Sequence, residues 1–173
     1  MKNLTVKNLV VTALLLALVV VVQQLRWLHP QLVAGPLVNA ILIVAAVWVG
    51  LYSGLAIAIL SPVFAFVFPP SPPLIQIMPV IMIGNAALVA CAYFLKNKNL
   101  AFGLLSGAVL KAVLLWLGVV HLVIPVFGSG LPEPAVTALS AMFSYNQFIT
   151  AVIGSVIVLS LKTRLDKSIG KSK

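Results

Sequence analysis

Residues 37–68, LVNAILIVAAVWVGLYSGLAIAILSPVFAFVF, decide the fold of this chain. A helix needs about 20 apolar residues to cross roughly 30 Å of hydrocarbon, so the stretch is too long for one ordinary crossing and short for two. The sequence GLYSG at 50–54 predicts a tight turn at its centre. Prolines from 69 to 73 end the stretch, because a proline cluster cannot continue a helix. Its polar side chains are Asn39, Tyr52, Ser53 and Ser61.

The composition of the whole chain places it in a membrane. Its 173 residues are 62% hydrophobic and 8% charged, whereas soluble domains are typically about 45–50% apolar and about 25% charged. One soluble core could not bury this excess, which excludes a soluble enzyme, a secreted disulfide module and a disordered tail. We expect a single integral membrane domain over residues 1–173. The net charge of +9 does not indicate nucleic-acid binding, because the bases sit at the ends of apolar runs.

The remaining apolar runs cover 9–25, 77–95, 100–126 and 136–161. The first run is long and lacks a small-x-small cleavage site, so we predict a retained helix and not a signal peptide. A loop is predicted at 26–36 (RWLHPQLVAGP), where Pro30 and the Gly35-Pro36 pair act as breakers.

The distribution of bases sets the number of crossings. Positive residues stay cytoplasmic in short loops, and nine of the eleven bases fall at residues 2–7, 96–98 and 162–173. If these three clusters are all inside, residues 37–68 must cross twice. The sequence therefore predicts an all-α polytopic protein of the bacterial cytoplasmic membrane with both termini cytoplasmic. Its six transmembrane helices are expected at about 9–25, 37–50, 54–68, 77–95, 100–126 and 136–161.

Lys111 is the ionisable residue that this topology places inside the membrane. It lies about 16 Å into its helix from the cytoplasmic end, at 1.5 Å per residue, which is too deep for easy snorkelling. Charges at this depth are expensive and are functional candidates. With no intramembrane acid, a bound anion, backbone carbonyls or water must satisfy the ammonium group. A substrate-facing lysine and a lysine held structurally at a broken helix both remain open.

Several polar side chains could form a layer above Lys111. Unpaired polar groups facing lipid cost several kcal/mol, so these side chains are expected to face the bundle interior. The alternative is interhelical hydrogen bonding alone, at about 0.6–2 kcal/mol per contact. Asn39 is the weaker candidate and is expected to bond at a helix end. The layer comprises Asn85, Asn146 and Gln147, and Tyr145 lies in the same helical turn as the last two.

The sequence offers no catalytic or metal-binding constellation. It has no GxxxxGK[ST] phosphate loop and no intramembrane aspartates for Mg²⁺. His29 and His121 have no helical spacing to each other and no acid companion for a metal. We therefore predict a binding subunit or conduit, with no enzyme activity, no cofactor and no metal.

The chain resembles the substrate-binding S component of energy-coupling factor (ECF) vitamin transporters. The resemblance covers nearly the whole length and includes a small-xxx-small face from Ala13 to Ala17 (ALLLA). The other similar stretches are GPLVN at 35–39, SPVFAF at 61–66 and PVIMIGN at 79–85.

The resemblance implies a mechanism and a site. An S component captures a vitamin outside, docks on a transmembrane T component through the alanine motif of its first helix, and topples to release substrate inward. Two cytoplasmic ABC ATPases drive this cycle. Ala13 and Ala17 would be the docking residues, and residues 26–31 would form a lid. Binding sites in this family lie at corresponding positions, so the resemblance implies a set of substrate-binding residues. They are Asn85, Lys111, His121, Tyr145, Asn146, Gln147 and, in the lid, Arg26.

The expected substrate is an anionic, water-soluble vitamin such as pantothenate, a folate or nicotinate. An anionic substrate would pair with the Lys111 ammonium group, because a buried ammonium without a partner is strongly disfavoured. Two other functions remain as alternatives. One is a small membrane scaffold or channel subunit, and the other is a membrane enzyme acting on a lipid headgroup, which the missing acids disfavour.

The charge partition generates a test of topology. A cysteine introduced at Lys98 in an otherwise cysteine-free chain should not react with an impermeant thiol reagent added to intact cells, because positively charged short loops stay inside. Labelling after membrane permeabilisation is the positive control. Reaction from outside would overturn the topology.

Overall fold

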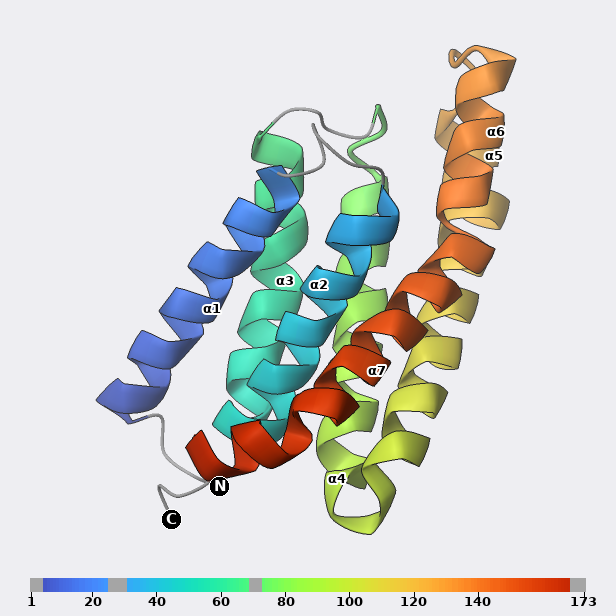
Figure 1. Cartoon of the computed structure of the whole chain (residues 1–173). Coiled ribbons are helices and arrows are strands. Elements are labelled where there is room, and N and C mark those ends of the chain that lie inside the picture. Colours follow the sequence, from blue (N-terminus) through green and yellow to red (C-terminus); the bar gives the residue numbers. More distant parts are fainter. Residues whose placement is uncertain (1–4, 25–30, 69–72, 169–173) are drawn as a thin grey trace.

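A computed structural model describes residues 5–24, 31–68 and 73–168, which are almost entirely helical (Figure 1). Asn99 has non-helical backbone angles (φ −153°, ψ 103°), so the chain folds back there and α4 forms two antiparallel segments. Its side-chain oxygen accepts a hydrogen bond from the Phe102 N–H at 3.1 Å and caps the second segment. The elements are α1 (Val6–Gln24), α2 (Gln31–Val44), the π-helix η2 (Ala45–Val49), α3 (Leu51–Val67), α4 (Ile77–Leu115), the π-helix η3 (Trp116–Val123), α5 (Ile124–Phe127), α6 (Glu133–Met142) and α7 (Tyr145–Ser168).

Within the described residues these elements join into six helical segments, as the charge pattern predicts. The second segment of α4 continues through η3 into α5, and α6 and α7 together form the last segment. In the part of the chain that the structure describes, three stretches are long and apolar enough to span a membrane, namely Val6–Gln24, Ile77–Phe127 and Glu133–Lys167, and the second contains the bend at Asn99. Shorter apolar helices cover Val33–Val49 and Leu51–Val67.

Two expected breaks are wrong in detail. The predicted loop at 26–36 is helical from Gln31 onward, with Pro36 inside α2. The predicted turn at 50–54 is confined to Gly50, whose φ of +146° reverses the chain in one residue, and α3 begins at Leu51. Gly54 instead packs inside α3, where an added Cβ would lie 3.1 Å from the Cα of Ala46.

Close backbone contact between α2 and α7 explains why helix-breaking residues are tolerated here. An ideal Cβ on Gly35 would lie 2.8 Å from the Thr150 methyl carbon, and one on Gly154 would lie 2.6 Å from the Pro36 carbonyl oxygen. Small residues let membrane helices approach in this way, and neighbouring helices support Pro and Gly inside membrane helices. Tertiary packing therefore overrides the local breaker signal.

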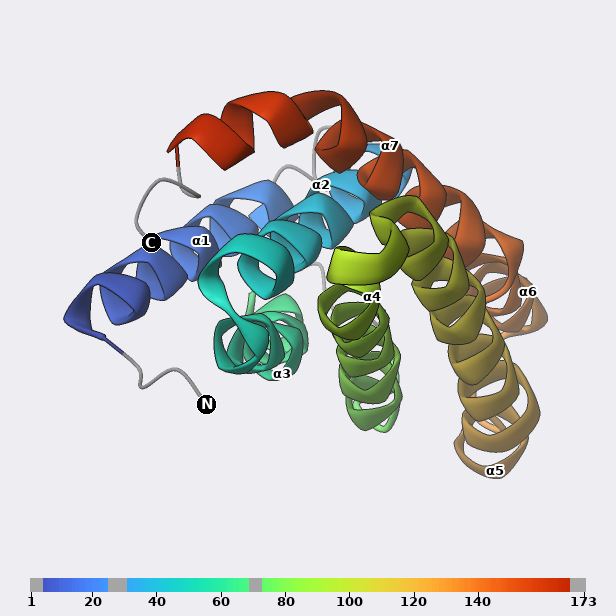
Figure 2. The same cartoon turned by 90° about the horizontal axis from the view of Figure 1, so that it is seen from below.

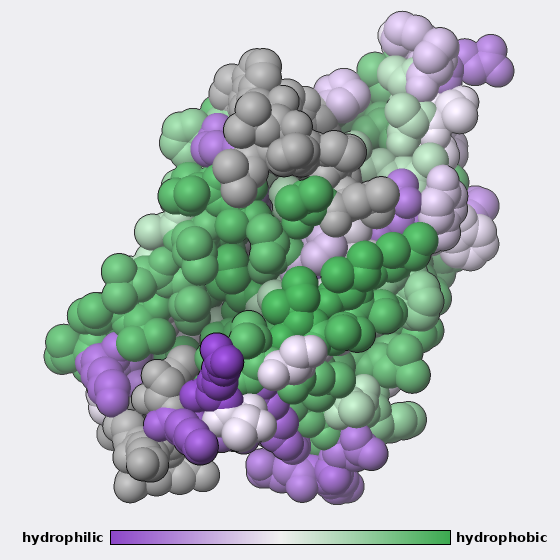
Figure 3. Space-filling model, viewed as in Figure 1, coloured by the Kyte–Doolittle hydropathy of each residue, from purple (hydrophilic) through white to green (hydrophobic). Residues whose placement is uncertain are grey.

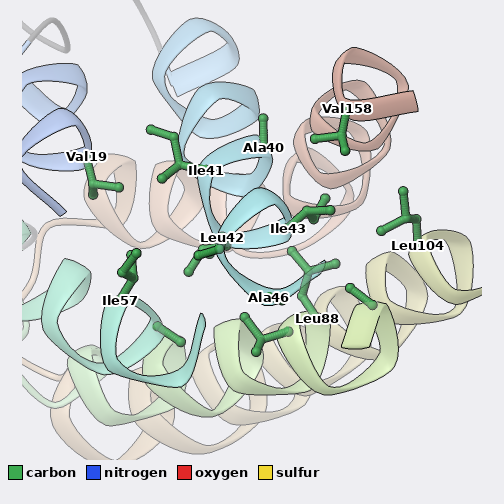
Figure 4. Packing of buried hydrophobic residues seen from close by; sticks show 14 of the residues in the cluster. Val19, Ala40, Ile41, Leu42, Ile43, Ala46, Ile57, Leu88, Leu104 and Val158 are labelled. Carbon is green, nitrogen blue, oxygen red and sulfur yellow. The ribbon is translucent and has the colours of Figure 1, made fainter. Parts of the chain in front are cut away.

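The core is apolar and lies mainly around α2. Leu42, Ile43, Ile57 and Leu88 are fully buried where α2, α3 and α4 meet (Figure 4). A second cluster, which includes Leu115, Val119 and Phe143, joins α4 and η3 to α6. Large apolar side chains also cover much of the outer surface, as expected for a lipid-facing bundle (Figure 3).

Polar contacts gather at one end of the bundle. The start of α1, the bend of α4 and the end of α7 lie at this end (Figure 1), and Figure 2 views the molecule from there. Trp48 Nε1 donates to an Asp166 carboxylate oxygen at 2.8 Å, and Lys96 Nζ donates to the Val47 carbonyl at 2.9 Å. The structure thus brings the described members of the three basic clusters to one side of the apolar band.

The contact between α2 and α7 can be tested with one methyl group. Gly154→Ala should lower the free energy of unfolding by about 1–3 kcal/mol, the usual cost of overpacking, because the new Cβ meets the backbone of α2. The measurement is the thermal midpoint of the detergent-solubilised protein. Gly130→Ala is the matched control, since nothing lies within 4 Å of its Cβ position. Equal melting of the two variants would contradict the close contact.

Candidate functional site

A cavity of about 110 Å³ lies between α1, α2, α3, both segments of α4 and the junction of α6 and α7. A single water needs only roughly 10–15 Å³ of such volume, so the space suits a small ligand. Apolar groups such as Phe66, Ile81 and Phe143 form part of the wall. The polar and charged side chains in the wall are Gln23, Asn39, Ser61, Asn85, Lys111 and Gln147.

The Lys111 ammonium group is the charged group in the wall of this cavity. The second segment of α4 carries it inward, and only 4% of the residue is exposed. Its Nζ donates to Asn39 Oδ1 at 2.5 Å and to Asn85 Oδ1 at 2.7 Å. One lysine therefore ties α2 to both segments of α4.

The two asparagine side chains are oriented by hydroxyl groups behind them. Asn39 Nδ2 donates to Thr150 Oγ1 at 3.5 Å, and Asn85 Nδ2 donates to Ser61 Oγ at 3.4 Å. The Thr150 hydroxyl in turn donates to the Gln147 carbonyl at 3.1 Å. An amide oxygen accepts and its NH₂ donates, so these contacts favour the orientation in which both oxygens face Lys111.

The cavity carries a positive charge without an acidic neighbour. The sequence contains two acids, Glu133 and Asp166. Glu133 is exposed at the start of α6 and Asp166 accepts from Trp48, and neither lines the cavity. Among the described residues, the hydrogen-bond partners of Lys111 are the two neutral amides.

The first helix presents a different surface outward. Ala13 and Ala17 are both exposed on α1, whereas Val19, Val22 and Gln23 are buried. Leu14 and Leu18 are also exposed beside the alanines. The ALLLA stretch is therefore an outward-facing apolar surface with small residues one turn apart.

Residues 7–162 match the family described as ECF transporter, substrate-specific component. The chain belongs to this family. It is a multi-pass membrane subunit of a transporter and not an enzyme, and its family partners are a T component and ATPases. No curated protein and no solved structure matches the chain.

The structure of this S component brings together some of the predicted site residues. Asn85, Lys111 and Gln147 line one cavity. His121 is exposed against the Trp116 ring (4.5 Å between centroids), Tyr145 is 62% exposed, and Asn146 is half-buried; none of the three lines the cavity. Arg26 and the rest of the expected lid before Gln31 lie outside the described residues.

Local helix geometry explains these placements. The π-helix η3 starts at Trp116, and its wider turns rotate His121 away from the face that an α-helix would give it. In α7, consecutive side chains point about 100° apart, so only Gln147 of the three neighbours Tyr145, Asn146 and Gln147 lines the cavity.

Two expectations about the polar groups need correction. Asn39 was expected at a helix end, but α2 starts at Gln31, and Asn39 is a buried mid-helix residue that accepts from Lys111. Lys111 was expected to need an anion, backbone carbonyls or water, whereas side-chain amides accept two of its hydrogen bonds.

Sequence reasoning missed three polar members of this region. Gln23 lies near the end of an apolar run, and its Nε2 donates to the Ser61 carbonyl at 2.9 Å. Ser61 and Thr150 stood out only as isolated hydroxyls in apolar runs. The spacing of Thr150 three residues after Gln147 was the available signal, because such residues share a helix face.

Proposed function

We propose that this S component captures a compact, water-soluble vitamin or related micronutrient that carries a carboxylate or a comparable anionic group. The observation that carries the proposal is the buried Lys111 ammonium in a cavity whose wall contains no acid. A buried charge is strongly disfavoured without full compensation. An anionic ligand would supply the missing negative charge.

The other wall groups suit the rest of such a ligand. Gln147 and the hydroxyl and amide groups near Lys111 offer hydrogen bonds, and Phe66 and Phe143 offer apolar contact. Small-molecule sites combine an apolar wall with a few polar groups in this way. The cavity volume favours a pantothenate- or nicotinate-sized ligand over a folate.

The position of the cavity supports capture from outside. Gln23 lies at the end of α1, Ala34 near the start of α2 and Phe66 near the end of α3. These helix ends lie opposite the bend at Asn99 (Figure 1). If the Lys96–Lys98 end is cytoplasmic, as the positive-inside rule predicts, the cavity lies toward the outer face.

Lys111→Met tests the anion proposal, because methionine keeps the length of the side chain and removes its charge. Removing one partner of a buried charge pair typically costs about 2–5 kcal/mol, or roughly 30-fold to several-thousand-fold in affinity. The ligand is first identified by mass spectrometry of molecules that co-purify with the protein. It is then titrated into wild type and variant by calorimetry.

The thermal midpoint of Lys111→Met serves as the control for folding. A change in affinity below about threefold in a folded variant would contradict anion pairing. Lys111 would then be a structural residue that joins α2 to α4.

We further propose that the exposed alanine face of α1 docks on the T component. Two small residues one turn apart let a partner backbone approach closely, and Ala13 and Ala17 are exposed on this helix. Gln23, on the buried side of α1, belongs to the cavity. Docking and substrate binding would therefore use different sides of one helix.

Bulky side chains on α1 should separate docking from binding. Ala13→Leu or Ala17→Leu should abolish transport in the complete transporter and change substrate affinity by less than about threefold, because the cavity stays intact. Uptake in cells and calorimetry on the purified subunit give the two readouts. Ala101→Leu, at an exposed alanine of α4, is the matched control and should retain both. Parallel loss of binding and transport would point to a structural role for these alanines.

A further inference from the structure

We propose that Asn39 and Asn85 determine the charge selectivity of the cavity, because they hold the Lys111 ammonium in place without neutralising it. This inference rests on the proposed anionic substrate and adds the residues that set the preference. The Asn–Lys–Asn arrangement is a preformed site for an anionic group.

The Lys111 ammonium group has one more donor than the two asparagines accept. An ammonium group has three N–H donors and no acceptor. Two of them go to Asn39 Oδ1 and Asn85 Oδ1. Within the described part of the chain no third acceptor bonds to the ammonium, and Lys111 lines the cavity. One donor is therefore available to a ligand.

The two hydrogen-bond partners of Lys111, Asn39 and Asn85, are uncharged. Asparagine oxygens stabilise the ammonium by hydrogen bonding and carry no negative charge that would neutralise it. A carboxylate at either position would form an ion pair with Lys111 and would cancel its charge. The cavity would then be neutral and would present a negative oxygen to an incoming anion. An amide at positions 39 and 85 therefore lets the cavity attract an anion, whereas a carboxylate there would repel it.

The side-chain amides of Asn39 and Asn85 are held in place by hydrogen bonds and by burial. They come from different elements, α2 and the first segment of α4, and each has a hydroxyl behind its NH₂ group, on Thr150 and Ser61 respectively. Asn39 is 2% exposed and Asn85 is 3% exposed. The ammonium is therefore fixed from two directions before any ligand enters.

Isosteric Asn→Asp variants test this inference. Asn39→Asp and Asn85→Asp add a charge with almost no change in shape, and Asn97→Asp adds the same charge at an exposed position far from Lys111. The probes are matched acid and neutral pairs, nicotinate with nicotinamide and pantothenate with pantothenol. Affinity is measured by equilibrium binding to the detergent-solubilised protein, and the readout is the acid-to-neutral affinity ratio.

The wild type and Asn97→Asp should prefer the acid of at least one pair. Asn39→Asp and Asn85→Asp should lower that ratio by at least about 30-fold, and their thermal midpoints should equal or exceed that of the wild type because Lys111 gains a charged partner. Asn85→Ser, which keeps a neutral oxygen, should retain the acid preference even if its overall affinity falls. This variant separates charge from packing.

The outcomes distinguish the inference from the proposed function. If folded Asp variants keep the acid preference while Lys111→Met loses it, the selectivity role of the asparagines is overturned and the anion proposal stands. If Asn85→Ser loses the preference as fully as Asn85→Asp, geometry and not charge is decisive, and the inference is again overturned. If Lys111→Met keeps the preference, or the wild type prefers no acid of either pair, the proposed function itself fails.

Discussion

The buried ammonium group of Lys111 is the constraint on which the interior of this protein depends. A charge in a membrane bundle must be satisfied internally, and here the solution draws oxygens from α2 and α4 to one point. Hydroxyls on α3 and α7 then orient those amides. Four of the elements around the cavity are thus joined by one polar network, while the remaining packing is apolar and less directional.

The general fold was predictable because its determinants are strong and can be identified within single stretches of sequence. Apolar runs, proline clusters and the grouping of bases predict the number of helices, and six helical segments are found in the described residues. The boundaries around Gly35, Pro36 and Gly54 were not predictable, because these residues are usually breakers. Here they provide close contacts with Thr150, Gly154 and Ala46, which exist only in the assembled bundle.

The site was predictable only in part for a similar reason. The depth of Lys111 singled it out, and Asn85 and Gln147 were identified as interior polar groups. The role of Asn39 depended on where α2 begins, and the position of His121 depended on a π-helix that has no simple sequence signal. Errors of a few residues in helix start or pitch rotate a side chain to another face.

The two sides of α1 have a consequence for how such a protein can diversify. Its alanines at positions 13 and 17 are exposed, whereas Gln23 near its end is buried and lines the cavity. Substitutions in the cavity can therefore alter the cargo without altering the surface available to a partner subunit. One set of partner subunits could then accept many such proteins, each with its own substrate. The outer surface of α1 would stay the same among them, and the cavity wall would differ.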